Sequence, residues 1–186
     1  RKGIEEEILK GMYLLKAGEK GDKKVQLMGS GVILNEVIKG AELLKNDFGV
    51  DADIWSVPSF NLLHRDAIEV ERYNRLHPLE EAKLPFVTRQ LQGYEGPVIA
   101  STDYIRSFAD RIRAYIPNDY HVLGTDGFGR SDSRANLRDF FEVDSRHVAV
   151  AALSALAEQG KVGKEVVQQA IEKYGIQTDT APSWKR

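Results

Sequence analysis

Charged side chains that could recognise a carboxylate or another anion gather between residues 126 and 138. Arg130, Arg134 and Arg138 recur every four residues, and Asp126 and Asp132 stand among them. Two parallel hydrogen bonds can join a guanidinium to a carboxylate, so such a pair fixes orientation as well as adding binding energy. This spacing predicts a recognition or assembly surface. The alternative is a solvated turn that only caps its helix.

The three arginines would form one cationic stripe if a helix extended back to the end of the loop. The helix dipole adds partial positive charge near a helix N-terminus, so cations there require an acidic partner. We expect Asp126 and Asp132 to supply that partner from within and to hold the loop rigid. The remaining charge would face a carboxylate on a neighbouring domain or on the second subunit of a dimer. If the stripe is merely exposed to water, each pair contributes less than about 1 kcal/mol.

A second turn, Gly29-Ser30-Gly31, lies between a strand-like and a helix-like segment. The N-terminus of a helix at this place can hold a phosphate. The turn lacks the third glycine of a dinucleotide fingerprint, and no Gly-Lys-Ser/Thr sequence follows it. The favoured interpretation is a tight turn that allows close packing of helix on sheet.

No catalytic, cofactor-binding or metal-binding residue is predicted in this chain. The sequence has no cysteine, which removes thiolate nucleophiles and thiolate ligands. Its histidines do not recur at the three- or four-residue spacing that places metal ligands on one helix face. They are His64, His77, His121 and His147. We expect structural or surface roles for them.

A site for thiamine diphosphate and magnesium is also not expected. Such a site needs Gly-Asp-Gly and, some two dozen residues later, an asparagine, which together hold the metal between diphosphate oxygens. Here Thr125 precedes Asp126-Gly127, and the corresponding stretch around Ala149–Ser154 has no asparagine.

Composition excludes several other classes of protein. The net charge of −2 and the pI near 6.1 argue against nucleic acid as the main partner. One basic cluster, Lys20, Lys23 and Lys24, stands beside acids in a surface turn. No run of 18 apolar residues is present, so no membrane span is expected, and the charged start carries no secretory signal. The sequence is typical of a cytoplasmic protein.

The elements that position the charged residues are a strand, a loop and a helix. Val122 and Leu123 end a short apolar run, and Gly124, Gly127 and Gly129 turn the chain into a loop. Asp132 or Ser133 can cap a helix that begins near Arg134. Leu137, Phe140 and Phe141 give that helix its apolar face. Strand, glycine-rich loop and capped helix form the half-unit from which α/β sheets build ligand sites and interfaces.

Similar patterns predict the remaining elements. Met12–Leu15 and Val25–Met28 are apolar runs around a polar loop, which predicts a hairpin and thus an antiparallel first strand. Further strands are expected over 52–57 and 97–101. Helices are expected over 4–9, 32–48, 84–91, 104–116 (capped by Asp103), 148–156 and 162–174, and a tail from 176. The charge-rich segment 60–76 should break at His77-Pro78.

Alternating strands and helices predict an α/β fold, a three-layer α/β/α sandwich around a mainly parallel sheet. The alanine-rich segment 148–156 is apolar nearly all round, so it should be buried on more than one side. No repeat or low-complexity linker divides the chain. We expect one domain over residues 1–186, processed or cut from a longer polypeptide, because it opens without methionine.

Several stretches resemble one family in the same order along the chain. They are Val25–Gly31, Asp53–Val57, Glu71–Pro78, Ala100–Tyr104, Gly124–Arg134 (GTDGFGRSDSR) and Phe141–Asp144. Together they resemble the C-terminal domain of the bacterial homodimeric pyruvate dehydrogenase component, a relative of the transketolase C-terminal domains. Departures occur at Tyr73, where the family often has tryptophan, across 61–66 and in the tail from Thr178.

The resemblance implies a five-stranded mixed sheet with one antiparallel edge strand. It implies a parent enzyme that decarboxylates pyruvate on thiamine diphosphate and magnesium, held by other domains, and transfers the acetyl group to lipoyl groups. The implied partners of this chain are the preceding domains, the second subunit of a homodimer and the acyltransferase component of the complex. The parent is thus expected to be an enzyme, and this chain alone is expected to be inactive.

The leading hypothesis is therefore an assembly and dimerisation domain. The rival is a free-standing α/β enzyme or small-molecule-binding domain that uses the loops at 29–31 and 126–133 as the polar walls of a cleft.

Overall fold

Five strands form one sheet in the order β1-β3-β2-β4-β5 in a computed structural model that describes residues 3–19 and 21–186. Their bounds are β1 Tyr13–Lys16, β2 Lys24–Gly29, β3 Asp51–Ser56, β4 Val98–Ser101 and β5 Tyr120–Leu123. β2, β3, β4 and β5 pair in parallel, and β1 pairs antiparallel with β3. The predicted mixed sheet with one antiparallel edge strand is confirmed. Lys20 of the basic cluster lies outside the described residues.

The first strand does not form the predicted hairpin. β1 pairs with β3, where Leu14 stands opposite Trp55, and a bulge interrupts the register between Leu14 and Lys16. The connection from β1 to β2 passes close over β3, because a Cβ at Gly18 would lie 2.6 Å from the carbonyl oxygen of Ala52. Since the loop crosses a neighbouring strand, it cannot be a tight turn between paired strands. Both edge strands, β1 and β5, are four residues long.

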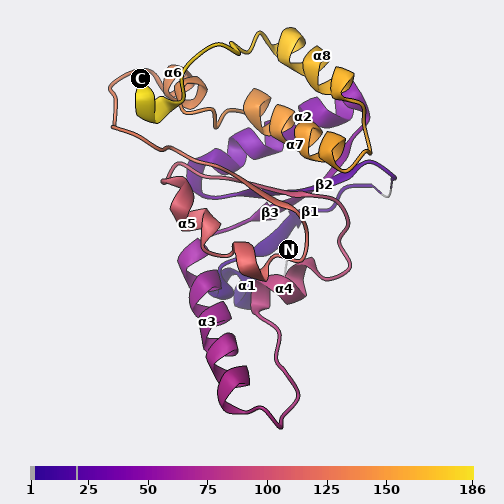
Figure 1. Cartoon of the computed structure of the whole chain (residues 1–186), viewed down its shortest axis with the longest axis vertical. Helices are drawn as coiled ribbons and strands as arrows, with labels where there is room; N and C mark the ends of the chain where they lie inside the picture. The colour runs from indigo at the N-terminus through magenta and orange to yellow at the C-terminus, as the bar shows by residue number, and fades with distance from the viewer. Residues whose placement is uncertain (1–2, 20) are drawn as a thin grey trace.

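Helices cover both faces of the sheet, as the predicted three-layer sandwich requires (Figure 1). One face carries α2 (Leu34–Phe48), α7 (Ser145–Glu158) and α8 (Lys164–Tyr174), and the other carries α1 (Glu5–Lys10), α3 (Phe60–Leu76), α4 (Phe86–Leu91) and α5 (Arg106–Asp110). α6 (Arg134–Phe140) follows β5, and the short 3₁₀ turns are η1 (Gly31–Ile33), η2 (Arg113–Tyr115) and η3 (Ser183–Lys185). Each face has its own buried apolar cluster. None of the described helices is long and apolar enough to cross a membrane.

Helix α7 is buried as its composition predicts. Ala149, Ala152 and Leu153 are fully buried. A Cβ at Gly40 of α2 would lie only 2.9 Å from Val148, so the two helices approach closely. Small side chains let helix backbones pack tightly, which explains the alanines of α7.

The segment predicted as one helix over 104–116 is broken into α5 and η2. The carbonyl oxygen of Tyr104 accepts a hydrogen bond from the Thr125 amide instead of starting the helix. Asp103 does not cap it, because the Asp126 carboxylate accepts from the Arg106 amide at 2.9 Å. A bond from the next loop thus fixes where α5 begins.

The charge-rich segment 60–76 is helix α3. The Ser59 hydroxyl caps it by accepting from the Leu62 amide, and it ends at His77 before Pro78 as predicted. Phe60, Leu63 and Ala67 are buried, whereas no residue from Ile68 to Leu84 is, all of which the structure describes. The outer half of α3 and the chain that follows it extend beyond the body of the domain (Figure 1).

Candidate recognition surface at the carboxyl edge of the sheet

Loops from three parallel strands meet at the carboxyl edge of the sheet and are joined by hydrogen bonds. The Ser30 hydroxyl, after β2, donates to the Thr102 hydroxyl, after β4, at 2.7 Å. The Thr125 amide and hydroxyl, after β5, donate to the carbonyls of Tyr104 and Asp103 at 2.9 and 2.8 Å. In α/β sheets ligands and partners bind at this edge, where neighbouring strands lead to opposite sides. β2 and β4 are such a pair, because β3 lies on the far side of β2.

The turn at Gly29-Ser30-Gly31 serves packing. A Cβ at Gly29 would lie 2.7 Å from the Cα of Leu34, so only glycine allows helix α2 to start so close to β2. The Ser30 hydroxyl is directed to Thr102, and Gly31 begins a 3₁₀ turn with a positive φ of 53°. These contacts support the tight-turn interpretation over a phosphate site.

The loop after β5 depends on glycine at one position of very close approach. A Cβ at Gly124 would lie 2.8 Å from the carbonyl oxygen of Tyr104. The loop is held on its other side by the C-terminal segment, because the Ser183 hydroxyl donates to the Asp126 carbonyl at 2.6 Å. The tail from 176 therefore packs back on the loop, which its sequence did not predict.

Asp126 and Asp132 were expected to pair with the arginines. Instead, both accept hydrogen bonds from backbone and side-chain amide groups. Asp126 accepts from the Arg106 amide. Asp132 accepts from the Ser133 amide and from the Asn136 side chain at 2.6 and 2.8 Å. The Ser133 hydroxyl caps α6 by accepting from the Asn136 amide, as predicted. Both acids thus hold the loop from within, and neither of them balances an arginine of the stripe.

The three arginines line one cavity, although α6 begins only at Arg134 and Arg130 lies outside the helix. The cavity has a volume of about 430 Å³. Its floor is apolar, and Asp103 and Thr125 also line it. The apolar residues are Val32, Ile33, Leu137, Phe141 and Val143. The four-residue spacing therefore does gather the arginines, through the loop as well as the helix.

The arginines differ in their partners. Arg138 donates to the Glu36 carboxylate of α2 at 2.8 Å, and that carboxylate also accepts from the Ser145 amide at 3.1 Å. The Arg130 guanidinium lies 4.2 Å from the centroid of the Phe140 ring. Among residues 3–19 and 21–186, no hydrogen bond or ion pair involves the Arg134 guanidinium. Arg130 likewise has no carboxylate partner among the described residues, so of the three arginines Arg134 is the one with neither a polar partner nor a ring contact.

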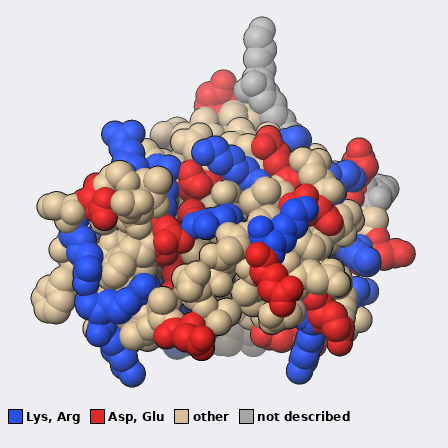
Figure 2. Space-filling model, turned by 90° about the horizontal axis from the view of Figure 1, so that it is seen from above, with Lys and Arg blue, Asp and Glu red and all other residues tan. Residues whose placement is uncertain are grey.

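Large apolar side chains of the loops at this edge are exposed to solvent. Val32, Tyr104 and Ile105 are 54%, 63% and 47% exposed, and Phe128 is 90% exposed. They belong to the loops after β2, β4 and β5. Seen from the α2 and α7 face, basic side chains border the left margin, the side on which Figure 1 draws α5 and α6 (Figure 2). We call the loops 30–33, 102–106 and 124–134 the carboxyl-edge surface.

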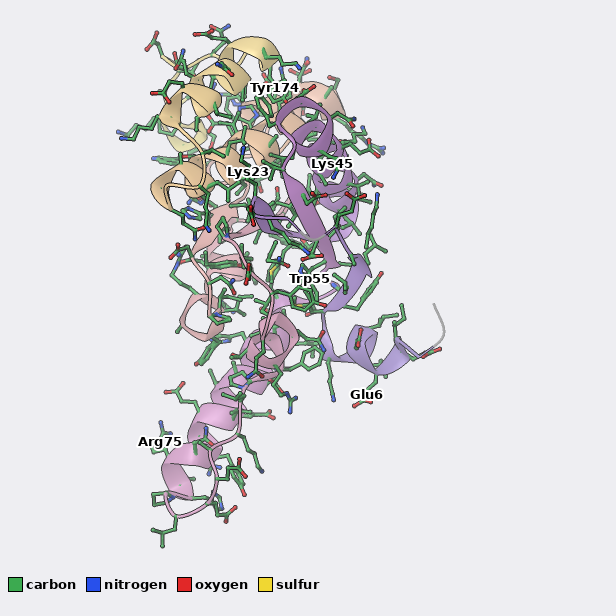
Figure 3. The ribbon with its side chains drawn as sticks, turned by 90° about the vertical axis from the view of Figure 1, so that its right-hand side faces the viewer. Glu6, Lys23, Lys45, Trp55, Arg75 and Tyr174 are labelled. Atoms are coloured by element: carbon green, nitrogen blue, oxygen red, sulfur yellow. The ribbon has the colours of Figure 1, made fainter. Side chains whose placement is uncertain are left out.

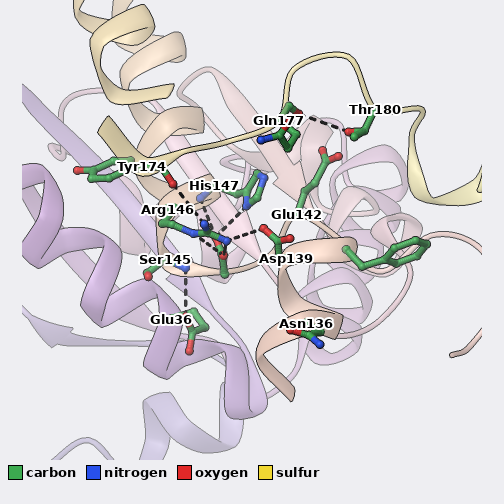
Figure 4. Close-up of polar contacts among 12 residues, drawn as sticks. Glu36, Asn136, Asp139, Glu142, Ser145, Arg146, His147, Tyr174, Gln177 and Thr180 are labelled. Atoms are coloured by element: carbon green, nitrogen blue, oxygen red, sulfur yellow. Dashed lines mark hydrogen bonds and ion pairs between the residues drawn. The ribbon is translucent and has the colours of Figure 1, made fainter. Parts of the chain in front are cut away.

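A second polar cluster joins the end of α6 to the start of α7 (Figure 4). Within the described part of the chain, Asp139, Asp144 and His147 are the group whose ligand atoms lie close enough to hold a metal. The Arg146 guanidinium already bridges both carboxylates, at 2.5 Å from Asp139 and 2.6 Å from Asp144. The cluster therefore has a structural role, because its ion pairs connect α6 to the start of α7.

Hydrogen bonds shift the pKa of the Asp144 carboxyl. Burial alone would raise this pKa, but bonds from the His147 side chain and amide and from Arg146 outweigh it. The pKa of Asp144 is therefore well below its ordinary value of 3.8. The same contact raises the pKa of Arg146.

Acid is expected to weaken the fold through Asp144. Because its pKa is lower in the folded chain than in the unfolded chain, its stabilising contribution is present above about pH 4 and is lost as the pH falls below that. Urea unfolding of the wild type and of Asp144→Asn should show a gap in unfolding free energy at pH 6 that shrinks at pH 3. The exposed control Asp179→Asn should show no such change. An equal Asp144→Asn gap at both pH values would contradict the assignment.

Sequence reasoning missed two residues of this region. Glu36 lies 102 positions before Arg138, and nothing near it in the sequence marks it as a partner. Arg186 lies 4.6 Å from the centroid of the Phe140 ring and donates to the Phe140 carbonyl at 3.0 Å. The basic C-terminus and the aromatic residues of α6 could have suggested this contact. They are far apart in the sequence, however, and only the fold brings Arg186 next to Phe140.

Comparison with known proteins gives consistent results. Residues 11–144 match the family described as the transketolase-like TK C-terminal domain. The pyruvate dehydrogenase E1 component of Pseudomonas aeruginosa is 58% identical over 177 residues, and that of Escherichia coli strain K12 is 51% identical over 178. These alignments cover 94% and 95% of this chain but 20% of each relative. The chain thus spans about a fifth of the length of these curated relatives.

Solved structures share the fold at low sequence identity. A transketolase from Campylobacter jejuni is 20% identical, with a TM-score of 0.52, over 79% of this chain and 19% of its own. A transketolase mutant from Pichia stipitis is 17% identical, with a TM-score of 0.55, over 84% and 19%. Likeness at this identity concerns the fold alone.

Proposed function

Because the chain belongs to the transketolase-like TK C-terminal domain family, we propose that it is the C-terminal assembly domain of a thiamine diphosphate-dependent pyruvate dehydrogenase. The parent decarboxylates pyruvate and transfers the acetyl group to lipoyl groups. Residues 1–186 act as one domain whose partners are the preceding domains, the second subunit of a homodimer and, through the whole enzyme, the acyltransferase component. The names of relatives at 51% to 58% identity support this proposal.

The observation that carries the assembly role is the carboxyl-edge surface. Val32, Tyr104, Ile105 and Phe128 are exposed on the loops that contribute to an apolar cavity, and Arg134 also lines that cavity. Large apolar side chains gathered in this way mark protein interfaces, and aromatic and arginine residues are enriched at them. The loops are rigid, because hydrogen bonds join all three of them. A rigid surface loses little conformational freedom when it docks.

In this proposal Arg134 receives a carboxylate from the partner. Its guanidinium lines the cavity, and an apolar wall beside it reduces competition from water. A desolvated arginine–carboxylate pair also fixes the orientation of two docked surfaces. Arg130 and Arg138 are held by Phe140 and Glu36, so they shape the cavity more than they recognise the partner.

Thiamine diphosphate and magnesium are assigned to the preceding domains. Bound there, the thiamine group would supply the electron sink that decarboxylation of pyruvate requires. The residues here do not fit a diphosphate-bound metal, because the Asp126 carboxylate is used by the Arg106 amide and Thr125 bonds to the Asp103 carbonyl. In this proposal, the residues of this chain take no part in the chemical steps of the reaction.

Arg134→Ala tests the assembly role. In the full-length polypeptide we expect at least a tenfold weaker dimer and lower pyruvate decarboxylation, since a buried carboxylate on the partner would lose its counter-charge. The 186-residue chain should keep its stability within about 0.5 kcal/mol, because Arg134 is exposed. Sedimentation equilibrium and urea unfolding measure the two.

The control is Lys161→Ala, which removes an exposed charge in the turn between α7 and α8. It should change neither quantity. If Arg134→Ala instead destabilises the isolated chain and leaves the full-length dimer fully active, the loop is internal scaffolding and the proposal is wrong.

A small-molecule site at the same edge is the second candidate, favoured by the cavity between the loops after β2 and β5. Its volume is within the range of ligand pockets, which is roughly 300–1,000 Å³. A short-chain fatty acid such as butanoate would suit an apolar floor beside Arg134. Saturable heat from butanoate in the full-length wild type, absent from Arg134→Ala, would favour this candidate over assembly.

A further inference from the structure

An arm formed by residues Ile68–Leu84 extends from the face of the sheet opposite α2, α7 and α8 (Figures 1 and 3). It consists of the outer half of α3 and the chain that returns toward α4. None of its residues is buried. Figure 3 places Arg75 far out on the arm and Glu6 on the neighbouring α1.

The arm has a defined shape because of contacts among its own residues. The Asn74 side chain donates to the Lys83 carbonyl and accepts from the Lys83 amide, both at 2.9 Å. Tyr73 stacks on His77, bonds to Glu80 and lies under the Lys83 ammonium. Contacts of this kind set the conformation of an exposed segment before binding, which lowers the entropy lost on docking.

Its exposed side chains include large apolar groups. Leu79 is fully exposed at 100%, and Ile68, Leu76 and Leu84 are 43%, 53% and 44% exposed. At the base of the arm, Leu9 of α1 is 77% exposed. The end of α1 packs beside the start of α3, because the Ser59 amide donates to the Gly11 carbonyl. Exposed apolar side chains therefore occur both on α1, beside the start of α3, and on the arm.

We propose that the arm and α1 form one docking surface for the preceding domain of the same polypeptide. This inference rests on the proposed function only in requiring such a domain. Relatives are about five times as long as this chain, since it spans 20% of them. A preceding domain joins this chain before α1, beside the base of the arm. Because that domain is covalently joined to this chain, its effective concentration at the arm is higher than that of a free partner. The arm thus meets its own chain before any other protein.

A photoreactive benzophenone side chain at position 79 of the full-length polypeptide tests the proposal. Crosslinks from the arm to the preceding domain are expected, and mixing ¹⁴N- and ¹⁵N-labelled protein shows whether they join one chain or two. The matched control places the group at Gln169, on the exposed polar side of α8, where no such crosslink is expected. Crosslinks only between two chains, or none beyond residues 1–186, would overturn the inference.

Leu79→Asp gives an independent measurement in the same full-length protein. Trypsin can cut after Arg75 and Lys83, and docking should protect both bonds. The variant should be cut there at least tenfold faster than wild type, with cutting after Lys161 unchanged. Equal and rapid cutting in wild type and variant would overturn the docking of the arm. Because Leu79 and Arg134 are on separate surfaces, failure here leaves the assembly role of the carboxyl-edge surface intact.

Discussion

Replacing Ala152 by aspartate is expected to lower the free energy of unfolding of the 186-residue chain by about 3–5 kcal/mol. Ala152 is fully buried within α7, in the apolar cluster on the α2 face of the sheet. Because no part of this residue is exposed, a carboxylate at position 152 would be buried away from water. Urea unfolding at pH 7 measures the loss.

The matched control is Ala135→Asp, which makes the same change at an exposed position in the first turn of α6. It should change stability by less than about 0.5 kcal/mol, because a carboxylate is favoured near a helix N-terminus. Unchanged stability of Ala152→Asp would mean that this face of α7 is in contact with water.

Arg138→Leu is expected to cost about 2–3 kcal/mol of stability, because it removes one partner of an ion pair and leaves the other buried. Glu36 is only 5% exposed, and Arg138 is the cation directly bonded to it. The loss is smaller than for a fully buried pair, since the Arg138 side chain is 23% exposed. Lys39→Leu is the control, because Lys39 is 3.6 Å from the same carboxylate but 62% exposed. It should cost less than about 0.5 kcal/mol.

A double variant separates the buried charge from lost packing. In Glu36→Gln/Arg138→Leu no charge remains to be buried, and the glutamine oxygen can still accept from the Ser145 amide. The double variant should therefore be more stable than Arg138→Leu alone by at least about 1 kcal/mol. If it is no more stable than Arg138→Leu, the unpaired Glu36 charge is not the cause of the loss, and packing of the arginine stem matters more.

Local sequence patterns predicted the element ends well. Gly11 and Gly49 end α1 and α2 in left-handed conformations, and Ser133 begins α6. These signals are local, because a cap or a left-handed residue satisfies the backbone groups of its own turn. The alternation of strands and helices likewise predicted the three-layer fold.

The errors arose where contacts distant in sequence decided the outcome. The strand that pairs with β1 is β3, and neither apolar run encodes that choice. α5 begins at Arg106 because Asp126, twenty residues later, accepts its amide hydrogen. Similarly, the arginines were identified from their spacing, whereas the partner Glu36 came from another helix. Charged residues of a loop can thus be identified from their spacing in the sequence, whereas the distant residues that neutralise their charge cannot.

The two ends of the sheet bear on how the domain behaves when it is produced by itself. Exposed strand edges can pair with those of another molecule and start aggregation. Here both edge strands are four residues long, and the bulge between Leu14 and Lys16 twists β1 away from a flat geometry. Edge-to-edge association is therefore disfavoured, and any self-association of the purified chain should involve side chains and weaken when Phe128 or Leu79 is made polar.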